Sequence, residues 1–234
     1  IAAWYQLAAA HFWDQDWVRC QRYLDKILDM QHGHPAAIRL QLVLNRVRQK
    51  TFDVKLAERL LRMDPDNHYI AWERFLSSGN LEDGARFQAK IRNELPTQTY
   101  LEMAIWYKTK LNRTEDAIRI MELAPPNNLI DYWLAYLHKD DKRKTEYLTK
   151  ADAGSAEMVF PFRRESARML EWAVSQTDSW KPAYYLALIH AHAGNADKAR
   201  ELLIEIPDHT GFAPLYVWRS GFHQDEKRKE TDLR

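Results

Sequence analysis

Apolar residues recur every three or four positions along most of the chain, and the pattern is clearest between Trp180 and Pro207. In the first half of this stretch one helical face carries Trp180, Tyr184, Ala187, Leu188 and Ala191. Gly194 then predicts a helix end in the left-handed conformation, and Asn195 is a suitable cap for a second helix. This second helix is expected to end at Pro207 and to bury Ala199, Leu202, Leu203 and Ile206. The stretch therefore predicts a helical hairpin.

The first 35 residues repeat this hairpin in the same register. Ala8 aligns with Ala187, and Cys20 takes the place of Ala199. These side chains are short, so two antiparallel helices can approach each other closely at these positions. Two copies in one register indicate a repeated structural unit rather than an isolated hairpin.

The spacing of Trp4, Leu7, Ala8 and His11 resembles the W-x2-L-G-x2-Y signature of the tetratricopeptide repeat, with Ala in place of Gly and His in place of Tyr. The resemblance implies a right-handed superhelix whose concave face is formed by the first helix of each hairpin. The predicted fold class is therefore all-α, an α-α superhelix (solenoid) of degenerate tetratricopeptide-like hairpins. Spacing between the copies varies by several residues, which is why we describe the repeats as degenerate.

We predict a single repeat array over residues 1–234. Its units cover approximately residues 1–35, 36–65, 66–96, 97–126, 127–151 and 163–207, followed by a terminal capping helix at 212–222. Proline ends nearly every unit. The second helix of the third unit is expected to bury Ala85, Ala89 and Ile91.

The later part of the chain is less regular. Residues 139–144 are expected to form a charged turn followed by a short helix, and residues 151–162 an ordered loop. A helix is predicted at 164–177, and its expected buried residues are Ala167, Leu170, Trp172 and Val174. The charged tail at 224–234 is expected to be frayed.

Composition narrows the classes of function. Lys plus Arg exceed Asp plus Glu by 34 − 33 = +1, so no overall charge favours binding to nucleic acid or to an anionic membrane surface. The chain has no run of about 18 apolar residues, so no membrane insertion is predicted, and its first twenty residues lack the basic start and apolar centre of a signal peptide. The chain begins at Ile1 inside a helical pattern, which predicts that it belongs to a longer protein.

Residues with catalytic or metal-binding potential are scattered. His190 and His192 stand two positions apart on a helix, so their side chains point in different directions. Cys20 is the single cysteine, which excludes an intrachain disulfide and a CxxC motif. GxSxG, HExxH and phosphate-binding glycine loops are absent from the sequence. We therefore predict no metal, no cofactor and no enzymatic activity in this chain.

The resemblance also implies which residues contact a ligand, because the family uses set positions of the first helix in each hairpin. Here these positions are held by Tyr5, Ala9, Phe12, Trp13, Tyr69, Glu73, Glu102, Trp106, Lys110, Tyr184, Leu188 and His192. The family variant that binds a C-terminal carboxylate uses Lys and Asn at several of these positions, which Tyr5 and Ala9 do not match. The aromatic residues either line a groove for a peptide, another domain or sugar rings, or only pack the superhelix.

The run at residues 160–163, with three apolar residues in a break between helices, leaves two alternatives, local burial or contact with a partner. With the segments WKPAYYLAL and FAPLYVWR, the segment FPFRRE is similar to C-terminal arrays of large bacterial proteins that carry an upstream β-sandwich domain related to carbohydrate-active folds. The leading hypothesis is a non-catalytic scaffold that binds a protein, a peptide or an upstream domain of its own chain. The alternative is an accessory region of a glycan-binding or glycan-processing protein. RNA binding is disfavoured by the balanced charge.

Overall fold

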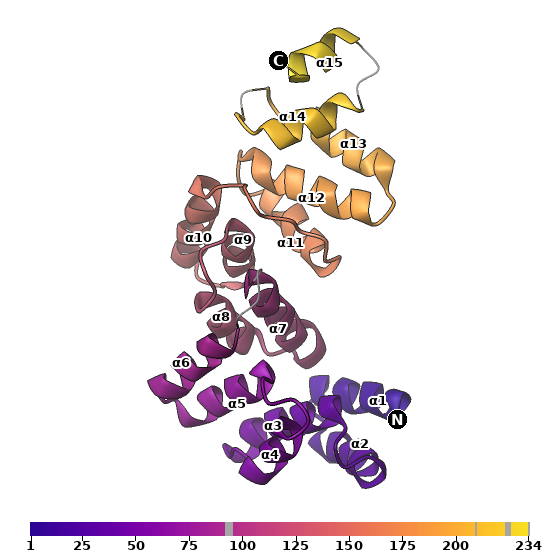
Figure 1. Ribbon diagram of the computed structural model, residues 1–234, viewed down its shortest axis with the longest axis vertical. Helices are drawn as coiled ribbons and strands as arrows, with labels where there is room; N and C mark the ends of the chain where they lie inside the picture. The colour runs from indigo at the N-terminus through magenta and orange to yellow at the C-terminus, as the bar shows by residue number, and fades with distance from the viewer. Residues whose placement is uncertain (92–95, 209, 223–225, 234) are drawn as a thin grey trace. The chain divides into compact units, whose positions relative to one another are not determined.

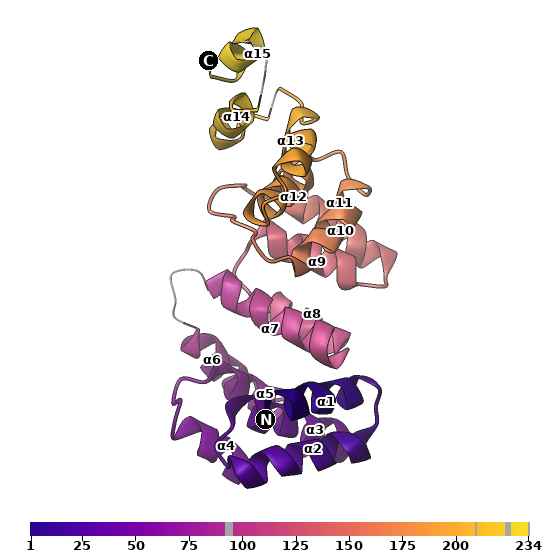
Figure 2. The same cartoon turned by 90° about the vertical axis from the view of Figure 1, so that its right-hand side faces the viewer.

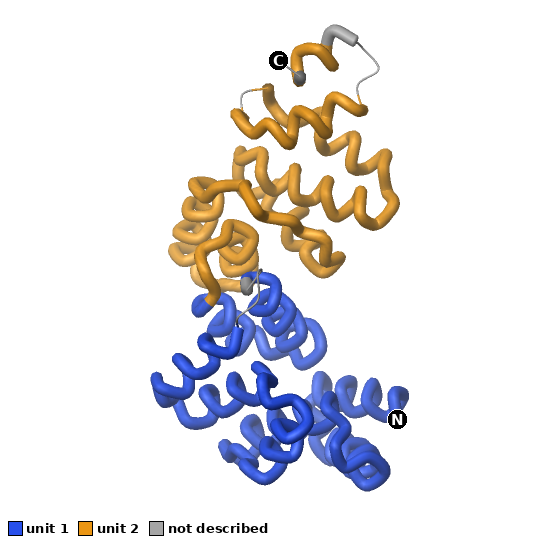
Figure 3. The backbone as a smooth tube through the Cα atoms, in the orientation of Figure 1, with its two compact units in different colours: residues 1–123 blue, residues 124–234 orange. Residues whose placement is uncertain are grey.

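The computed structural model describes residues 1–91, 96–208, 210–222 and 226–233, and all secondary structure within these residues is α-helical (Figure 1). An all-α fold class is therefore confirmed. The chain divides into two compact units, residues 1–123 and residues 124–234, which are coloured separately in Figure 3. Each unit is described by itself. No helix in the described part is long and apolar enough to cross a membrane.

The described residues of unit 1 form four consecutive helix pairs. Its helices are α1 (Ala2–Trp13), α2 (Trp17–Met30), α3 (Pro35–Gln49), α4 (Val54–Leu61), α5 (His68–Ser78), α6 (Leu81–Lys90), α7 (Pro96–Leu111) and α8 (Thr114–Glu122). Each odd-numbered helix packs against the helix that follows it, and α3 also packs against both α1 and α5. In addition α1 packs against α7 (Figure 2). The first helices of these pairs therefore contact one another as well as their own partners, which a single hairpin would not show.

The starts of these helices follow from polar residues directly before them. The Asp53 side chain accepts a hydrogen bond from the Leu56 amide at 2.9 Å, and the Asn67 side chain accepts one from the Ile70 amide at 3.1 Å. Both satisfy amides that have no partner inside the first helical turn. At the other end, Gly79 closes α5 with a φ of +66°. Local sequence thus determines where these helices begin and end.

Apolar side chains of α3, α4 and α5 form a buried cluster that includes Ile38, Leu42, Leu60 and Ile70. Each such side chain contributes about 1.5–3 kcal/mol by leaving water. In α6 the buried residues are Asp83, Gly84 and Phe87, whereas Ala85 and Ala89 are exposed. The expectation that Ala85 and Ala89 are buried was therefore wrong, because the buried face of α6 lies about one residue earlier in the sequence. A Cβ at Gly84 would lie 3.0 Å from the Phe75 ring, so glycine is the small residue that allows the close approach.

Unit 2 contains the remaining helices, α9 (Asn128–Leu137), α10 (Asp141–Ala153), α11 (Glu165–Val174), α12 (Trp180–His192), α13 (Ala196–Ile204), α14 (Ala213–Ser220) and α15 (Glu226–Leu233). In this unit α9 packs against α10 and α11, and contacts continue from α11 through α12, α13 and α14 to α15. Figure 1 shows the same succession, with colours that run from dark pink at α9 and α10 through orange to yellow at α15.

The hairpin of α12 and α13 forms at the predicted residues. Gly194 has a φ of +82°, and Ala187 and Ala199 are fully buried. Asn195 is the residue before α13, but its side chain makes no capping hydrogen bond. The predicted turn is therefore confirmed, and the predicted role of the Asn195 side chain is wrong.

Other expectations for unit 2 are corrected. Helix α10 already begins at Asp141 because Asp140 caps it through the Arg143 amide at 2.9 Å, so the expected charged turn is shorter and the helix longer. In α11 the buried residues are Ser166, Met169, Leu170 and Ala173, whereas Val174 is 40% exposed. The predicted terminal helix is present as α14.

A further helix, α15, occupies most of the tail that was expected to be frayed. It is held to α14 through Arg219, which is 2% exposed and donates a hydrogen bond from Nε to Asp232 Oδ2 at 3.0 Å. A second bond joins Arg219 Nη2 to Asp232 Oδ1. The charged composition of the tail predicted disorder because the sequence does not show that one of its carboxylates meets a buried arginine.

Candidate functional site

The predicted ligand-contacting residues are divided between the two units. Unit 1 holds Tyr5, Phe12, Trp13, Tyr69, Glu73, Glu102, Trp106 and Lys110, together with the small residue Ala9, and unit 2 holds Tyr184, Leu188 and His192. Several are buried inside their own unit: Ala9 and Tyr69, and also Phe12, Glu73 and Tyr184 at 1%, 0% and 7% exposure. These side chains fill the interior instead of facing an open groove.

Aromatic packing explains two of these buried positions. The Phe12 ring lies 5.2 Å from that of Trp17, edge to face, and Tyr184 lies 5.5 Å from Phe212 and 6.1 Å from Trp218. Such pairs hold neighbouring helices together. For Phe12 and Tyr184 the structure thus agrees with the alternative that aromatic residues pack the helical core.

Tyr69 and Trp106 meet around an arginine that the sequence did not single out. The Arg39 guanidinium carbon lies 4.0 Å from the Tyr69 ring centre and 4.4 Å from the Trp106 ring centre. The two rings are 5.6 Å apart and nearly perpendicular. We call Arg39, Tyr69 and Trp106 the aromatic clamp. Its members come from α3, α5 and α7, so it forms only when three helix pairs are packed together.

The aromatic clamp is half-open to solvent. Arg39 and Trp106 are half-buried, and Tyr69 is buried. Arg39 Nε is buried without a hydrogen-bond partner. Among the described residues, no carboxylate forms an ion pair with Arg39. A guanidinium that lies close to two aromatic rings and has no carboxylate partner among the described residues is suited to recognise an incoming polar group.

A second arginine on α3 has a different environment. Arg46 Nε donates to Glu73 Oε2 at 2.7 Å, and Arg46 Nη2 donates to Asp116 Oδ2 at 2.8 Å. The Tyr107 hydroxyl also donates to Glu73, and Arg113 Nε donates to Asp116 Oδ2 at 2.9 Å. We call Arg46, Glu73, Tyr107, Arg113 and Asp116 the carboxylate network. It is a structural ion cluster, so Glu73 does not act as the exposed ligand contact that the resemblance implied.

The electrostatics of this network favour the charged pair. Burial by itself lowers the pKa of Arg46, but the charge and hydrogen bond of Glu73, and then the charge of Asp116, raise it above its ordinary value. Burial and the nearby Glu73 carboxylate raise the pKa of Tyr107 well above its ordinary value. Arg46 therefore stays protonated and Tyr107 stays a neutral donor at physiological pH.

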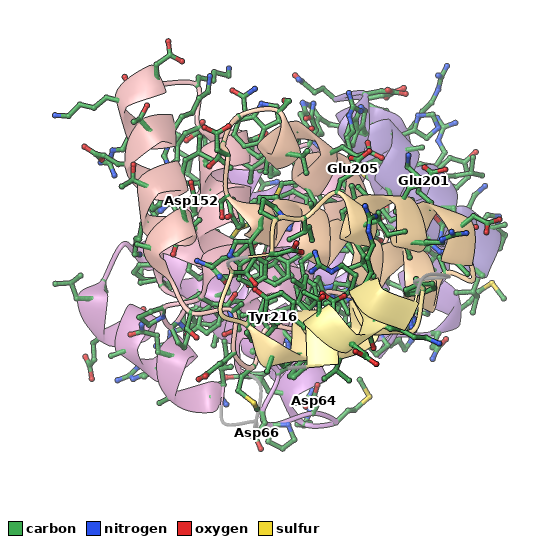
Figure 4. All side chains as sticks on the ribbon, turned by 90° about the horizontal axis from the view of Figure 1, so that it is seen from above. Asp64, Asp66, Asp152, Glu201, Glu205 and Tyr216 are labelled. Carbon is green, nitrogen blue, oxygen red and sulfur yellow. The ribbon has the colours of Figure 1, made fainter. Side chains whose placement is uncertain are left out.

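His68 and Glu102 border the aromatic clamp. The His68 ring lies 4.9 Å from the Tyr69 ring, and Glu102 is exposed on α7 one turn before Trp106. Burial lowers the pKa of His68 below 6.5, whereas the charges of Glu102 and Asp64 act in the opposite direction. Asp64 is labelled in Figure 4 and lies between α4 and α5. The surroundings of the clamp thus carry negative charge beside the arginine.

A cavity of about 670 Å³ lies beside His68. Asp66, Arg86 and Lys90 are among the residues that line it. Lys90 Nζ donates to the Pro65 carbonyl oxygen at 2.7 Å, and Arg86 bonds to Glu82 at 2.7 Å. Ile91, in the cavity wall, directly precedes the undescribed residues 92–95. We assign no ligand to this cavity.

The remaining predicted residues lie apart from the clamp. Tyr5 is half-buried near His34, with ring centres 6.4 Å apart, and Trp13 and Lys110 are exposed near the C-terminal ends of α1 and α7. In unit 2 Leu188 is half-buried, and exposed His192 lies 6.2 Å from the Phe162 ring.

The apolar loop before α11 combines both alternatives that the sequence left open. Val159 and Pro161 are buried, whereas Met158, Phe160 and Phe162 are 70%, 57% and 42% exposed. Alternate side chains of this run therefore anchor the loop, and the others face solvent.

Cys20 is buried, and its thiol has a raised pKa. Burial raises the pKa of the Cys20 thiol to about 12, so the thiol is protonated and a poor nucleophile at neutral pH. Within the described residues, no group of three or more His, Cys, Asp or Glu side chains could hold a metal ion.

The residues missed by sequence reasoning share one signal. Arg39 and Arg46 stand seven positions apart on a helix whose remaining sequence is largely apolar, so they occupy the same face. Charged residues at such spacing in an apolar helix indicate a buried or half-buried polar cluster.

No protein-family model matches the chain, and no curated protein matches it.

Proposed function

We propose that the chain is a non-catalytic scaffold of tetratricopeptide-like helical hairpins that binds a protein or peptide, either a separate partner or another domain of its own polypeptide. The proposal rests mainly on the aromatic clamp. This half-open surface is built by side chains from three successive helix pairs of unit 1. A binding surface assembled across stacked hairpins is typical of helical-repeat scaffolds.

The solenoid arrangement is part of this proposal. In unit 1 the first helices of successive pairs contact each other from α1 to α3 and from α3 to α5. In unit 2 the helices pack in order along the chain from α11 to α15. Packing between neighbouring hairpins supports an array, because the repeats of a solenoid contact mainly their sequence neighbours. The contact of α1 with α7 in unit 1 is an exception to this pattern.

The residue types of the clamp also suit protein recognition. Trp, Tyr and Arg are enriched among the residues that dominate binding energies at protein interfaces. Trp106 and Arg39 already contact each other, with the guanidinium carbon 4.4 Å from the ring centre, so less side-chain freedom is lost when a partner binds.

Selection from a displayed random-peptide library against the purified chain tests the proposal. We expect enriched peptides whose affinity falls about tenfold or more in Trp106→Ala, which removes the ring that contacts Arg39 and Tyr69. Phe160→Ala is the control, because Phe160 is an exposed aromatic residue in unit 2. Trp106→Phe retains a ring and should restore much of the affinity.

Circular dichroism melting of each variant separates lost binding from lost folding. Failure to enrich any peptide, or equal affinity of enriched peptides for wild type and a folded Trp106→Ala, would refute the proposal. The alternative of a glycan-related accessory region predicts a different result. In that case oligosaccharide titration would give a saturable tryptophan fluorescence change that Trp106→Ala abolishes.

A further inference from the structure

Two arginines of α3 occupy equivalent positions but have different partners. Arg39 and Arg46 are seven residues apart, which places them on the same face about 10 Å from each other along the helix. Arg46 is paired with Glu73 from α5 and Asp116 from α8. Arg39 lies close to the rings of Tyr69 from α5 and Trp106 from α7, with no carboxylate partner among the described residues.

The sequences of α5 and α7 continue this correspondence. Tyr69 and Glu73 lie one turn apart on α5, so the ring faces Arg39 and the carboxylate faces Arg46. On α7, Trp106 contacts Arg39, and its neighbour Tyr107 bonds to Glu73. Unit 1 thus has two arginines at successive positions along α3. Arg46 is paired with carboxylates, and Arg39 contacts aromatic rings instead.

Arg39 has an unused hydrogen-bond donor, because its Nε is buried without a partner. The Tyr69 and Trp106 rings are nearly perpendicular to each other, so at most one of them can lie parallel to the planar guanidinium. A carboxylate that reaches Arg39 accepts hydrogen bonds in the plane of the guanidinium and supplies the partner that Nε lacks. The two rings also keep the guanidinium in a fixed orientation, which reduces the entropy lost on binding.

We propose that Arg39 binds the carboxylate of an acidic side chain in a partner polypeptide, in the way that Arg46 binds Glu73 within the chain. This inference rests on the proposed function and names the chemistry of its partner. Glu102 and Asp64 carry negative charge nearby, so a run of acidic residues would be repelled. The fitting partner segment alternates acidic and apolar residues, since an apolar neighbour also suits the Trp106 ring.

Two synthetic peptides provide the test, acetyl-(Glu-Phe)3-amide and acetyl-(Gln-Phe)3-amide. Their blocked ends remove the terminal carboxylate, so they differ only in side-chain charge. We expect calorimetry on the full chain to show about tenfold tighter binding of the Glu peptide, and this preference should weaken with added salt.

Variants on α3 locate the effect. Arg39→Gln should abolish the preference for the Glu peptide, and Arg39→Lys should retain only part of it, because lysine keeps the charge without the planar edge. Arg48→Gln is the matched control, since Arg48 is exposed on the same helix. It should retain the preference, and melting curves should verify that each variant is folded.

The outcomes separate this inference from the proposed function. Equal binding of both peptides to wild type, reduced for both by Trp106→Ala, would refute the Arg39 assignment and support the scaffold. Binding of neither peptide, or an unchanged preference in folded Arg39→Gln, would also overturn the assignment. Only the library selection tests the scaffold by itself.

Discussion

Arg46 on α3 and Glu73 on α5 form a two-point ion pair inside unit 1. Arg46 Nε lies 2.7 Å from Glu73 Oε2, and Arg46 Nη2 lies 3.2 Å from Glu73 Oε1. The Glu73 side chain is 1% exposed and that of Arg46 is 11% exposed, so solvent screens the pair little. Arg46 and Glu73 are 27 residues apart in sequence and belong to two consecutive helix pairs. The ion pair therefore couples the packing of one hairpin to that of the next.

Replacing Glu73 by Gln should destabilise unit 1 by about 3 kcal/mol, because the change leaves part of the Arg46 charge buried and uncompensated. Urea unfolding followed by circular dichroism measures the loss. Glu82→Gln is the control, since Glu82 is 67% exposed in its pair with Arg86, and it should cost about 0.5 kcal/mol or less. Equal losses in the two variants would contradict a structural role for the carboxylate network.

Gly194→Ala should cost about 1 kcal/mol of unfolding free energy in unit 2. The backbone φ at Gly194 is +82°, which disfavours a residue with a Cβ, although no heavy atom would lie within 4 Å of that Cβ. Gly221→Ala is the matched control, because Gly221 has a φ of −65° and should tolerate alanine. A neutral Gly194→Ala would mean that the turn relaxes to another conformation.

His68 should titrate below pH 6.5 in the folded chain, because burial disfavours its charged form. The Glu102 charge opposes this shift, so Glu102→Gln should lower the His68 pKa further. NMR titration of the imidazole measures both values. A His68 pKa at or above 6.5, or one raised by Glu102→Gln, would contradict the described environment.

The lowered pKa of His68 makes the stability of the folded chain depend on pH. The folded chain binds the His68 proton less readily than the unfolded chain does, so this contribution to stability is fully present above pH 6.5. It is lost as the pH falls from 6.5 through the lower folded pKa. Unfolding measured over this range should therefore show a weaker pH dependence in His68→Gln than in wild type.

Asp232→Asn should loosen α15, because it leaves the buried Arg219 guanidinium with a weaker partner. We expect amide hydrogen exchange within residues 228–232 to accelerate by about tenfold or more. Asp208→Asn provides the comparison, since Asp208 also contacts Arg219 but is 76% exposed. If exchange in α15 were unchanged in Asp232→Asn, the ion pair would not be what holds this helix.

Much of the site could not be predicted from the sequence. The resemblance singled out Tyr69 and Trp106 as ligand contacts, and the structure brings them together around Arg39. It also singled out Glu73, Phe12 and Tyr184, which are buried inside their units. Helical periodicity predicts which residues share a helix face. It does not predict how deeply that face is buried by neighbouring helices, which depends on contacts such as that of α1 with α7.

By itself the sequence determined the all-α class, the hairpin of α12 and α13, and the close approach at Ala187 and Ala199. These features follow from local rules, since helix periodicity, small side chains and the left-handed preference of Gly194 act over a few residues. Only the tertiary structure decided that Arg46 meets Glu73 and Asp116, which are 27 and 70 residues away, and that Arg39 meets aromatic rings instead. The physical reason is that the partners of a buried charge come from hairpins that are distant in sequence. The pattern of apolar and polar residues within one helix does not determine how these hairpins pack.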